Sequence, residues 1–349
     1  MNFGVELGDR SYEVVVQDGA RHHLASLIAD RAPRAQSAVV VTTPTLATQP
    51  WFDVDAGIAQ HRLMVPEGES AKTFSALQEL LESLAGLRLS RDDVVVAVGG
   101  GAVTDLVGFA AAVYLRGVGV VQIPTSLVGQ VDAAIGGKTG INLGAGKNLV
   151  GSFHQPLGVL CDTSVLSNLP ERERRSGLGE VAKCWILEGR DVVSLHRASL
   201  TELIEVSAGL KVAIVSDDER EGGRRVLLNY GHTLAHALEK IALARDDNEL
   251  RHGEAVAIGL AFAARLARAL DRVGDDVVTY HDDVLRTLEL DGRLGHAYGT
   301  DEILEAMTFD KKARHDLSFV LDGPEGFSLV SGVERAFVGN VLDRFKGES

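Results

Sequence analysis

Three short segments in the second half of the chain carry side chains that bind divalent metal ions. Glu180 and Lys183 are three residues apart in SGLGEVAK, and His232 and His236 are four apart in NYGHTLAHALE. Both spacings place the paired side chains on one face of a helix. His252 opens a third segment, HGEAVAIG. Two imidazoles and a carboxylate with an open position form a catalytic zinc site, so we predict one here, with both His232 and His236 available as ligands.

The spacing of these histidines argues against one common class of zinc enzyme. The segment HTLAH lacks the glutamate of the HExxH motif, in which a glutamate between the two ligands acts as general base. A metalloprotease is therefore disfavoured.

A glycine-rich turn in the first half has the features of a phosphate site. The apolar run Val94–Val98 leads into Gly99–Gly101, and a helical pattern follows over Ala102–Tyr114. Glycines let the backbone approach a phosphate, and a helix N-terminus offers free N–H groups. The spacing is not GxGxxG, so the Rossmann fingerprint is absent. An ordinary tight turn with no ligand is the alternative interpretation of these glycines. Upstream, Glu67–Lys72 begins a further helix after the strand-like run His61–Val65.

A basic, glycine-rich segment follows. Residues 116–150 hold eight glycines and the cations Arg116, Lys138 and Lys147, against a single acid, Asp132. Long irregular loops in compact domains are usually functional, and lysines supply point charges for phosphate. We interpret the segment as an anion-binding loop; a flexible basic surface loop is the alternative, and Asp132 would then neutralise the lysines. Candidate anion-binding residues also occur downstream: Lys211, Arg225, Asn229, Lys311 and Lys312.

The elements that position these residues differ between the two halves. Alternating strand and helix patterns indicate βαβ units and a parallel sheet up to Pro170, and mainly helices after it. We therefore predict an α/β domain over 1–170 and a helical domain over 171–349. Further expected elements are a strand at Ser37–Thr43, a helix at Ala71–Leu87 with Phe74, Leu77, Leu81 and Leu84 on one face, a strand at Val118–Ile123, and a central buried helix at Ala255–Leu270.

Composition excludes several classes of protein. The chain has 349 residues and a net charge of −14, which makes it a poor binder of nucleic acids and anionic membranes. Its two cysteines, Cys161 and Cys184, form no CxxC pair and suit a reducing compartment. No signal peptide and no apolar run of about 18 residues are present, so we expect a cytoplasmic location.

Taken in order, five motifs resemble the 3-dehydroquinate synthase and wider sugar phosphate cyclase family, over about residues 60 to 325. They are GGGAVTD, PTSLVGQVDAAIGGKTGINLGAGKN, LPERE…GLGEVAK, DERE…LNYGHTLAHALE and RHGEAVAIG. The resemblance implies an NAD-binding Rossmann-like domain (1–170), a helical metal- and substrate-binding domain (171–349), an active site between them, and a homodimer.

The resemblance also implies roles for single residues. The zinc ligands are Glu180, His232 and His252. The NAD contacts are Glu67, Glu69, Lys72, Gly100, Gly101, Asp105, Thr125, Ser126, Asp132, Lys138, Lys147, Val165 and Asn168. The substrate pocket takes Asp132, Lys138, Asn148, Lys183, Lys211, Arg225, Asn229, His236 and one of Lys311 and Lys312, while Arg116 resembles a residue that reaches the phosphate from the partner subunit. Ser126 and Asn168 stand where the family usually has threonine, and both keep a polar group.

The implied reaction is a cyclisation with loss of phosphate, catalysed by a carbon–oxygen lyase of the shikimate pathway. NAD and Zn²⁺ or Co²⁺ would assist conversion of 3-deoxy-D-arabino-heptulosonate 7-phosphate, a small phosphorylated sugar acid, to 3-dehydroquinate. Arg225, with Lys211 and Asn229, favours a substrate that carries a carboxylate.

Three alternatives remain, and one of them, a catalytically inactive cofactor-binding regulator, is disfavoured because Glu180, His232 and His252 are all present. An aminodehydroquinate synthase, or another cyclase of secondary metabolism, is favoured by CWILEGRDVVSL after Lys183, which departs from the usual dehydroquinate synthase pattern. From another reaction class, metal-dependent NAD alcohol dehydrogenases share the GGG turn but lack GGKTGINLGAGKN.

Overall fold

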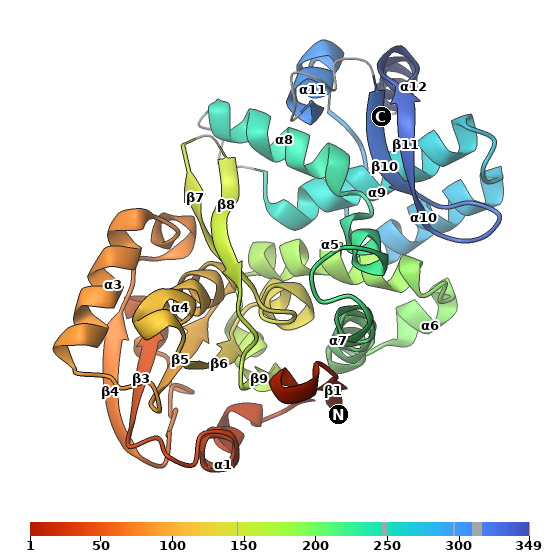
Figure 1. Ribbon diagram of the computed structural model, residues 1–349. Coiled ribbons are helices and arrows are strands. Elements are labelled where there is room, and N and C mark those ends of the chain that lie inside the picture. The colour runs from red at the N-terminus through yellow and green to blue at the C-terminus, as the bar shows by residue number, and fades with distance from the viewer. Residues whose placement is uncertain (145, 246–249, 296, 309–315, 349) are drawn as a thin grey trace. The chain divides into compact units, whose positions relative to one another are not determined.

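The computed structural model of the chain describes residues 1–144, 146–245, 250–295, 297–308 and 316–348 (Figure 1). It divides into two compact units: residues 1–174 with 200–220, and residues 175–199 with 221–349. The predicted division made a single cut near residue 170. The compact units instead assign 200–220 to the first, because helix α7 (Leu200–Asp217) packs against strands β1 (Asn2–Val5) and β2 (Tyr12–Gln17).

The first unit is built on a seven-stranded sheet with the order β1-β2-β9-β6-β5-β3-β4. Only the β1–β2 pair is antiparallel, so the predicted parallel α/β architecture is confirmed. The remaining strands are β3 (Ser37–Thr42), β4 (Ala59–Met64), β5 (Val94–Gly99), β6 (Gly119–Pro124) and β9 (Gly158–Asp162). Further elements of this unit are α1 (Leu24–Arg31), α2 (Pro44–Ala47), α3 (Phe74–Gly86), α4 (Gly101–Val113), the hairpin β7 (Lys138–Leu143) and β8 (Gly146–Phe153), and the short helical turns η1 (Gly8–Arg10), η2 (Ala20–His23), η3 (Gly68–Ala71), η4 (Tyr114–Arg116), η5 (Gly129–Ala133) and η6 (Thr163–Asn168).

The central strands are apolar on both faces because helices cover both faces of the sheet. On β3, Val39 and Val41 belong to the core formed with α3 and α4, whereas Ala38 and Val40 belong to the core formed with α1. Successive side chains of a strand point to opposite faces, so an unbroken apolar run fits a strand buried on both sides.

Two details of the first unit differ from the prediction. Phe74 was expected on the buried face of its helix, but it is 55% exposed, and the face that packs is formed by Leu77, Leu80 and Leu84. Phe74 is the first residue of α3 and precedes the packed turns.

The basic glycine-rich segment is also more regular than the predicted loop. After β6 it forms the π-helical turn η5 and the antiparallel hairpin β7–β8. In this hairpin Gly151 lies so near its partner strand that a β-carbon would stand 2.0 Å from the Thr139 carbonyl oxygen. Some of these glycines therefore serve strand pairing.

The second unit is mainly helical, as predicted, with one small antiparallel hairpin that the sequence did not reveal. The elements of the second unit are α5 (Glu171–Leu187, from residue 175 onward), α6 (Val192–Arg197), η7 (Arg224–Asn229), α8 (His232–Ala244), α9 (His252–Ala269), α10 (Asp275–Thr287), α11 (Thr300–Met307), β10 (Asp316–Leu321), β11 (Ser328–Glu334) and α12 (Arg335–Gly347). Helix α9 is buried along most of its length, which confirms the expected central helix. Across the described ranges, none of the helices has the length and hydropathy needed to span a bilayer.

Glycines allow the backbones of α5, α8 and α9 to touch. A β-carbon on Gly253 would lie 1.6 Å from the Ser176 carbonyl oxygen, and one on Gly179 would lie 2.2 Å from the Gly253 carbonyl oxygen. Where α8 meets α9, a β-carbon on Gly259 would lie 1.9 Å from the carbonyl oxygen of Gly231, itself at φ +78°. Any side chain at these glycines would push the helices apart.

One buried carboxylate organises the end of strand β9 in the first unit. Asp162 accepts hydrogen bonds from Gly19 N (2.9 Å), Arg21 Nη1 (2.6 Å) and Ser164 N (3.0 Å). Burial opposes its ionisation, but the hydrogen bonds from Ser164 and Arg21 outweigh burial and hold the pKa of Asp162 below its ordinary value. Asp162 therefore joins η2 to η6 at the carboxyl end of strand β9.

We expect Gly253→Ala to lower the free energy of unfolding by about 3 kcal/mol or more, because backbone must move to admit the methyl group. Gly347→Ala is the matched control, since a β-carbon at the last residue of α12 meets nothing within 4 Å. Urea unfolding of both variants measures the difference. Equal stability of the two variants would contradict the close helix contact.

We expect Asp162→Asn to lower the free energy of unfolding by about 3 kcal/mol at pH 7, because buried Arg21 loses its buried partner. Since folding lowers the pKa of Asp162, this stabilisation is complete above the ordinary value of 3.8 and is lost as the pH falls through the folded value. The difference in the free energy of unfolding between wild type and Asp162→Asn therefore becomes smaller as the pH falls. Asp53→Asn is the control, because Asp53 also binds Arg21 but is 57% exposed; an equal effect there would contradict the assignment.

Candidate functional site

Three side chains of the second unit, carried by three different helices, converge on one point. Glu180 lies in α5, His232 is the first residue of α8, and His252 is the first residue of α9. Glu180 Oε1 lies 3.3 Å from His232 Nε2 and 3.0 Å from His252 Nε2. One ligand atom from each residue lies within 4.8 Å of the other two. The structure thus brings together the three residues that the resemblance selected, and His232 rather than His236 faces Glu180.

The outer nitrogens of both imidazoles are held by acceptors. His232 Nδ1 lies 3.0 Å from the Tyr230 carbonyl oxygen, and His252 Nδ1 lies 3.2 Å from Glu239 Oε2. A carbonyl or carboxylate acceptor requires the Nδ1 proton, so each Nε2 is left facing Glu180 as a lone-pair donor when the ring is neutral. Neither acceptor was predicted from the sequence. The sequence did offer one signal for Glu239: it is an acidic residue on the apolar face of α8, seven residues after His232.

Charge is balanced locally around Glu180, which is fully buried. Lys183 Nζ lies 2.5 Å from Glu180 Oε2, the oxygen that does not face the histidines. Burial would raise the pKa of Glu180, but the charges of Lys183 and His232 outweigh it and hold that pKa well below its ordinary value. Burial would likewise lower the pKa of His252, yet hydrogen bonds to Glu180 and Glu239 raise it to about 10.

These donors fit a divalent transition metal ion. One carboxylate oxygen and two imidazole nitrogens form the donor set of many catalytic zinc sites, which keep a fourth position for water or substrate. The side chain of Glu180 is not exposed, that of His232 is 11% exposed and that of His252 is 31% exposed. An ion held here would be reachable from the His252 side.

Three more of the predicted site residues in the second unit come from the stretch of chain around His232, residues 225–236. The His236 ring is 5.3 Å from that of His232, centroid to centroid, and its side chain is exposed. Arg225 is fully buried in η7. Asn229 Nδ2 donates to Glu221 Oε1 at 2.9 Å.

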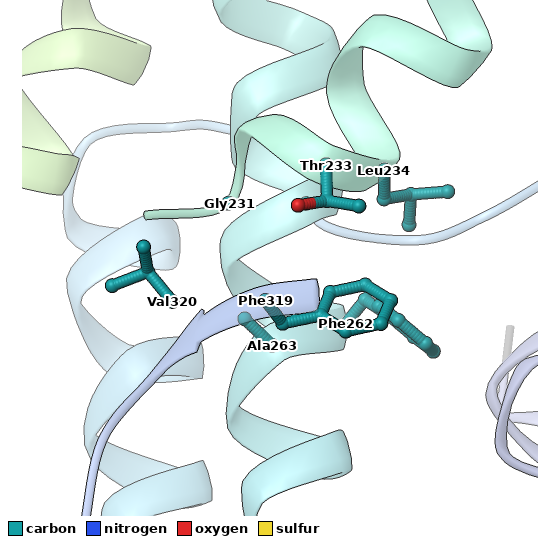
Figure 2. A pocket seen from close by; sticks show the side chains of 8 residues that line it. Gly231, Thr233, Leu234, Phe262, Ala263, Phe319 and Val320 are labelled. Atoms are coloured by element: carbon teal, nitrogen blue, oxygen red, sulfur yellow. The ribbon is translucent and has the colours of Figure 1, made fainter. Parts of the chain in front are cut away.

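A small cavity beside the metal-binding candidates is too small for a substrate. It measures about 10 Å³, which is room for one water molecule. Figure 2 shows Thr233, Leu234 and Phe262 around it, with Phe319 and Val320 on the β10 side. It is part of the packing behind the start of α8.

In the first unit, the predicted phosphate turn lies at the carboxyl edge of the sheet. Gly100 caps α4, and a β-carbon there would lie 3.3 Å from Ser126 Oγ. Thr125 N donates to the Gly99 carbonyl oxygen at 2.9 Å, which joins the ends of β5 and β6. Gly100, Gly101, Thr125 and Ser126 therefore lie together at the edge where open α/β sheets bind ligands.

A polar cluster lies next to this turn. Buried Lys72 donates from Nζ to Asp105 Oδ2 at 2.5 Å and also to Asn148 Oδ1. Burial raises the pKa of Asp105 to about 6, with Lys72 opposing the rise. Glu69 and Glu67 are held by Asn142 Nδ2 and Thr45 N respectively. The structure thus groups Lys72, Asp105 and Asn148, which are far apart in the sequence.

A second ion pair of this unit joins α7 to η5. Lys211 Nζ lies 2.5 Å from both Asp132 Oδ1 and the Asp132 carbonyl oxygen. In the alternative interpretation of this segment, Asp132 neutralises nearby lysines; this ion pair joins it to a lysine 79 residues later in the chain. Lys211 lies in the first unit, whereas Arg225 and Asn229 lie in the second.

The remaining predicted residues lie mainly on the surface. Arg116 is exposed in a turn where residues 115–117 all have positive φ. Val165 is buried in η6, while Lys138, Lys147 and Asn168 are exposed. Lys311 and Lys312 lie outside the described residues.

Comparisons with known proteins agree with the motifs. The models for the 3-dehydroquinate synthase N-terminal and C-terminal domains match residues 62–176 and 177–313. A protein of Amycolatopsis mediterranei (strain S699) named "Putative aminodehydroquinate synthase" is 47% identical over 99% of this chain and 95% of its own. A 3-dehydroquinate synthase of Mycobacterium leprae (strain TN) is 42% identical over 90% of each chain.

A solved structure with the same fold comes from a sugar phosphate cyclase. It is the 2-epi-5-epi-valiolone synthase of Streptomyces hygroscopicus subsp. jinggangensis 5008, with NAD⁺ and Zn²⁺ bound. It aligns with a TM-score of 0.81 and 27% identity, covering 97% of each chain. The two domain models and the near full-length relatives lead to one conclusion: this chain belongs to the 3-dehydroquinate synthase family.

Proposed function

We propose that the chain is a 3-dehydroquinate synthase, a lyase that cyclises 3-deoxy-D-arabino-heptulosonate 7-phosphate and releases phosphate. The observation that carries this proposal is the convergence of Glu180, His232 and His252, whose ligand atoms lie within 4.8 Å of one another. Family membership supports the reaction class, and the NAD⁺ and Zn²⁺ bound to the valiolone synthase support the cofactors. We further propose that the enzyme acts as a homodimer.

Bound NAD would take up and return a hydride, while Zn²⁺ or Co²⁺ would stabilise negative charge on a substrate oxygen. Glu180, His232 and His252 would hold the metal ion. Lys183 keeps Glu180 ionised by occupying its second oxygen. The Tyr230 carbonyl oxygen lies 3.0 Å from His232 Nδ1, and Glu239 Oε2 lies 3.2 Å from His252 Nδ1.

The first unit supplies the proposed cofactor site. Backbone N–H groups at the start of α4, at Gly100 and Gly101, would receive the pyrophosphate, because a helix N-terminus favours anions. Thr125 and Ser126 border the same turn. The remaining contacts in this proposal are Glu67, Glu69, Lys72, Asp105, Asp132, Lys138, Lys147, Val165 and Asn168.

The substrate carries a carboxylate and a phosphate, so several cations are required. Arg225 is the proposed carboxylate partner, because its planar guanidinium matches a carboxylate in two parallel hydrogen bonds. His236, exposed beside His232, is the group we propose to hydrogen-bond phosphate or to pass a proton. The other proposed substrate contacts are Asn148, Lys183, Lys211, Asn229, Lys138, one of Lys311 and Lys312, and Arg116 of the partner subunit.

A second candidate function is favoured by one specific observation. The relative at 47% identity is named as an aminodehydroquinate synthase, whereas the 3-dehydroquinate synthase of Mycobacterium leprae (strain TN) is 42% identical. The amino enzyme would act on a nitrogen-bearing analogue of the same substrate. The two functions share the metal, the cofactor and the carboxylate site, so only substrate preference separates them.

We expect Glu180→Gln to abolish turnover and to weaken zinc binding more than 100-fold, because the neutral amide is a poor ligand and leaves Lys183 without its carboxylate. Metal content after dialysis, measured by mass spectrometry, and turnover are the readouts. Glu188→Gln, an exposed change just after the same helix, is the control and should keep both. A Glu180→Gln enzyme with full zinc content would remove Glu180 from the ligand set.

We expect phosphate release from 3-deoxy-D-arabino-heptulosonate 7-phosphate with no net NADH, because the hydride is returned in each turnover. The assay compares this substrate with its amino analogue and with sedoheptulose 7-phosphate. Preference for the amino analogue would select the second candidate function, and net NADH without phosphate release would indicate an alcohol dehydrogenase.

The same assay tests the carboxylate site. Arg225→Ala should raise the KM for the heptulosonate phosphate about 100-fold, since a buried charged partner is lost. Residual turnover of sedoheptulose 7-phosphate, which has no carboxylate, should change far less. Equal losses on both substrates would refute the role given to Arg225.

A further inference from the structure

Of the three converging side chains, His252 has the least packing around it. Its side chain is 31% exposed, compared with 11% for His232 and none for Glu180. Like His232, it is the first residue of its helix, so no preceding helical turn confines its ring. A ligand in this position needs another group to fix its orientation.

We infer that Glu239 is a positioning residue that fixes the ring of His252 and thereby sets the affinity for the metal ion. This inference rests on the proposed metal site. Glu239 Oε2 lies 3.2 Å from His252 Nδ1, and Glu239 is only 8% exposed. It lies on α8, seven residues after His232, so one helix provides both a ligand and the support for the next ligand.

The chemistry follows from the two nitrogens of an imidazole. A neutral ring carries its proton on one nitrogen and offers a lone pair on the other. A carboxylate at Nδ1 accepts only from a protonated nitrogen, so it selects the tautomer with a free Nε2 lone pair. Nε2 lies 3.0 Å from Glu180 Oε1, so a metal ion bound between them would receive that lone pair. The carboxylate also makes the imidazole a stronger donor to a metal ion.

The two histidines differ in how they are supported. The acceptor for His232 Nδ1 is a backbone carbonyl, that of Tyr230, which persists whatever side chain stands there. The acceptor for His252 is a side chain, so sequence change can remove it. Glu239 also adds a second buried negative charge near the proposed cation, next to the Glu180–Lys183 pair.

The test measures metal affinity and stability separately on the full-length protein. Wild type, Glu239→Gln, Glu239→Ala, Glu180→Gln and Glu305→Gln are stripped of metal with a chelator and titrated with Zn²⁺ against a chromophoric competitor. Visible spectra of the Co²⁺ forms report ligand geometry. Unfolding of each metal-free variant in urea reports any purely structural effect. Glu305→Gln makes the same charge change at an exposed site on α11.

We expect Zn²⁺ affinity to fall about 100-fold in Glu239→Ala and about 10-fold in Glu239→Gln, because the amide oxygen still accepts from Nδ1. The Co²⁺ spectrum should shift in both variants, while Glu305→Gln matches wild type. The inference is overturned if both Glu239 variants bind Zn²⁺ within twofold of wild type. It is also overturned if affinity falls but the Co²⁺ spectra are unchanged and the metal-free variants are destabilised enough to account for the loss.

Failure of the proposed function would look different in the same experiment. Wild type would then bind no Zn²⁺, or Glu180→Gln would bind it as tightly as wild type. Tight binding by wild type with loss in Glu180→Gln establishes the site, and the Glu239 variants then decide the inference alone.

Discussion

The second unit depends on keeping one ionised carboxylate away from water. Glu180 is fully buried, and an isolated charge in such a place would cost far more than the net stability of a domain. It is tolerated because Lys183 Nζ lies 2.5 Å from one oxygen and two imidazole nitrogens lie 3.0–3.3 Å from the other. The chain therefore commits three helices, α5, α8 and α9, to bringing those partners to one point.

Glycine makes that convergence sterically feasible. Each converging side chain has a glycine as its direct neighbour in the sequence: Gly179 before Glu180, Gly231 before His232 and Gly253 after His252. The β-carbon positions of Gly179 and Gly253 are already taken by backbone atoms of the facing segment, as is that of Gly259 in α9, which faces Gly231. Helices with side chains at these positions would stand several ångströms farther apart, and the ligand atoms would no longer share one ion.

The first unit applies a different constraint to the proposed cofactor site. A parallel sheet buried on both faces leaves its carboxyl edge as the place where loops gather. Gly100 and Ser126 meet there because β5 and β6 are adjacent strands. This fold is shared by enzymes with different substrates, so the fold alone does not select a reaction. The substrate assignment rests instead on the cations of the site, Arg225 above all.

The sequence alone predicted the parallel α/β sheet, the mainly helical second half and the central helix α9, because apolar periodicity reports which faces are buried. It also placed Glu180 three residues from Lys183, and these two do form an ion pair. Local patterns failed where packing between distant segments decided the outcome. Phe74 continues the apolar stripe of its helix but lies in the first turn, beyond the packed face, and the glycine-rich segment is a hairpin because its two halves pair with each other.

Spacing alone did not distinguish His232 from His236, since both occupy the same face of one helix. The family resemblance selected His232, and the tertiary structure gives the physical reason, because the start of α8 lies next to Glu180. The tertiary structure also revealed Glu239 at His252, Asn148 at Lys72 and Lys211 at Asp132. The physical reason is that spacing along one helix is fixed by its pitch and can be read from sequence. A contact between two helices or two loops depends on how closely their backbones approach, and that distance is set by side chains elsewhere in the fold.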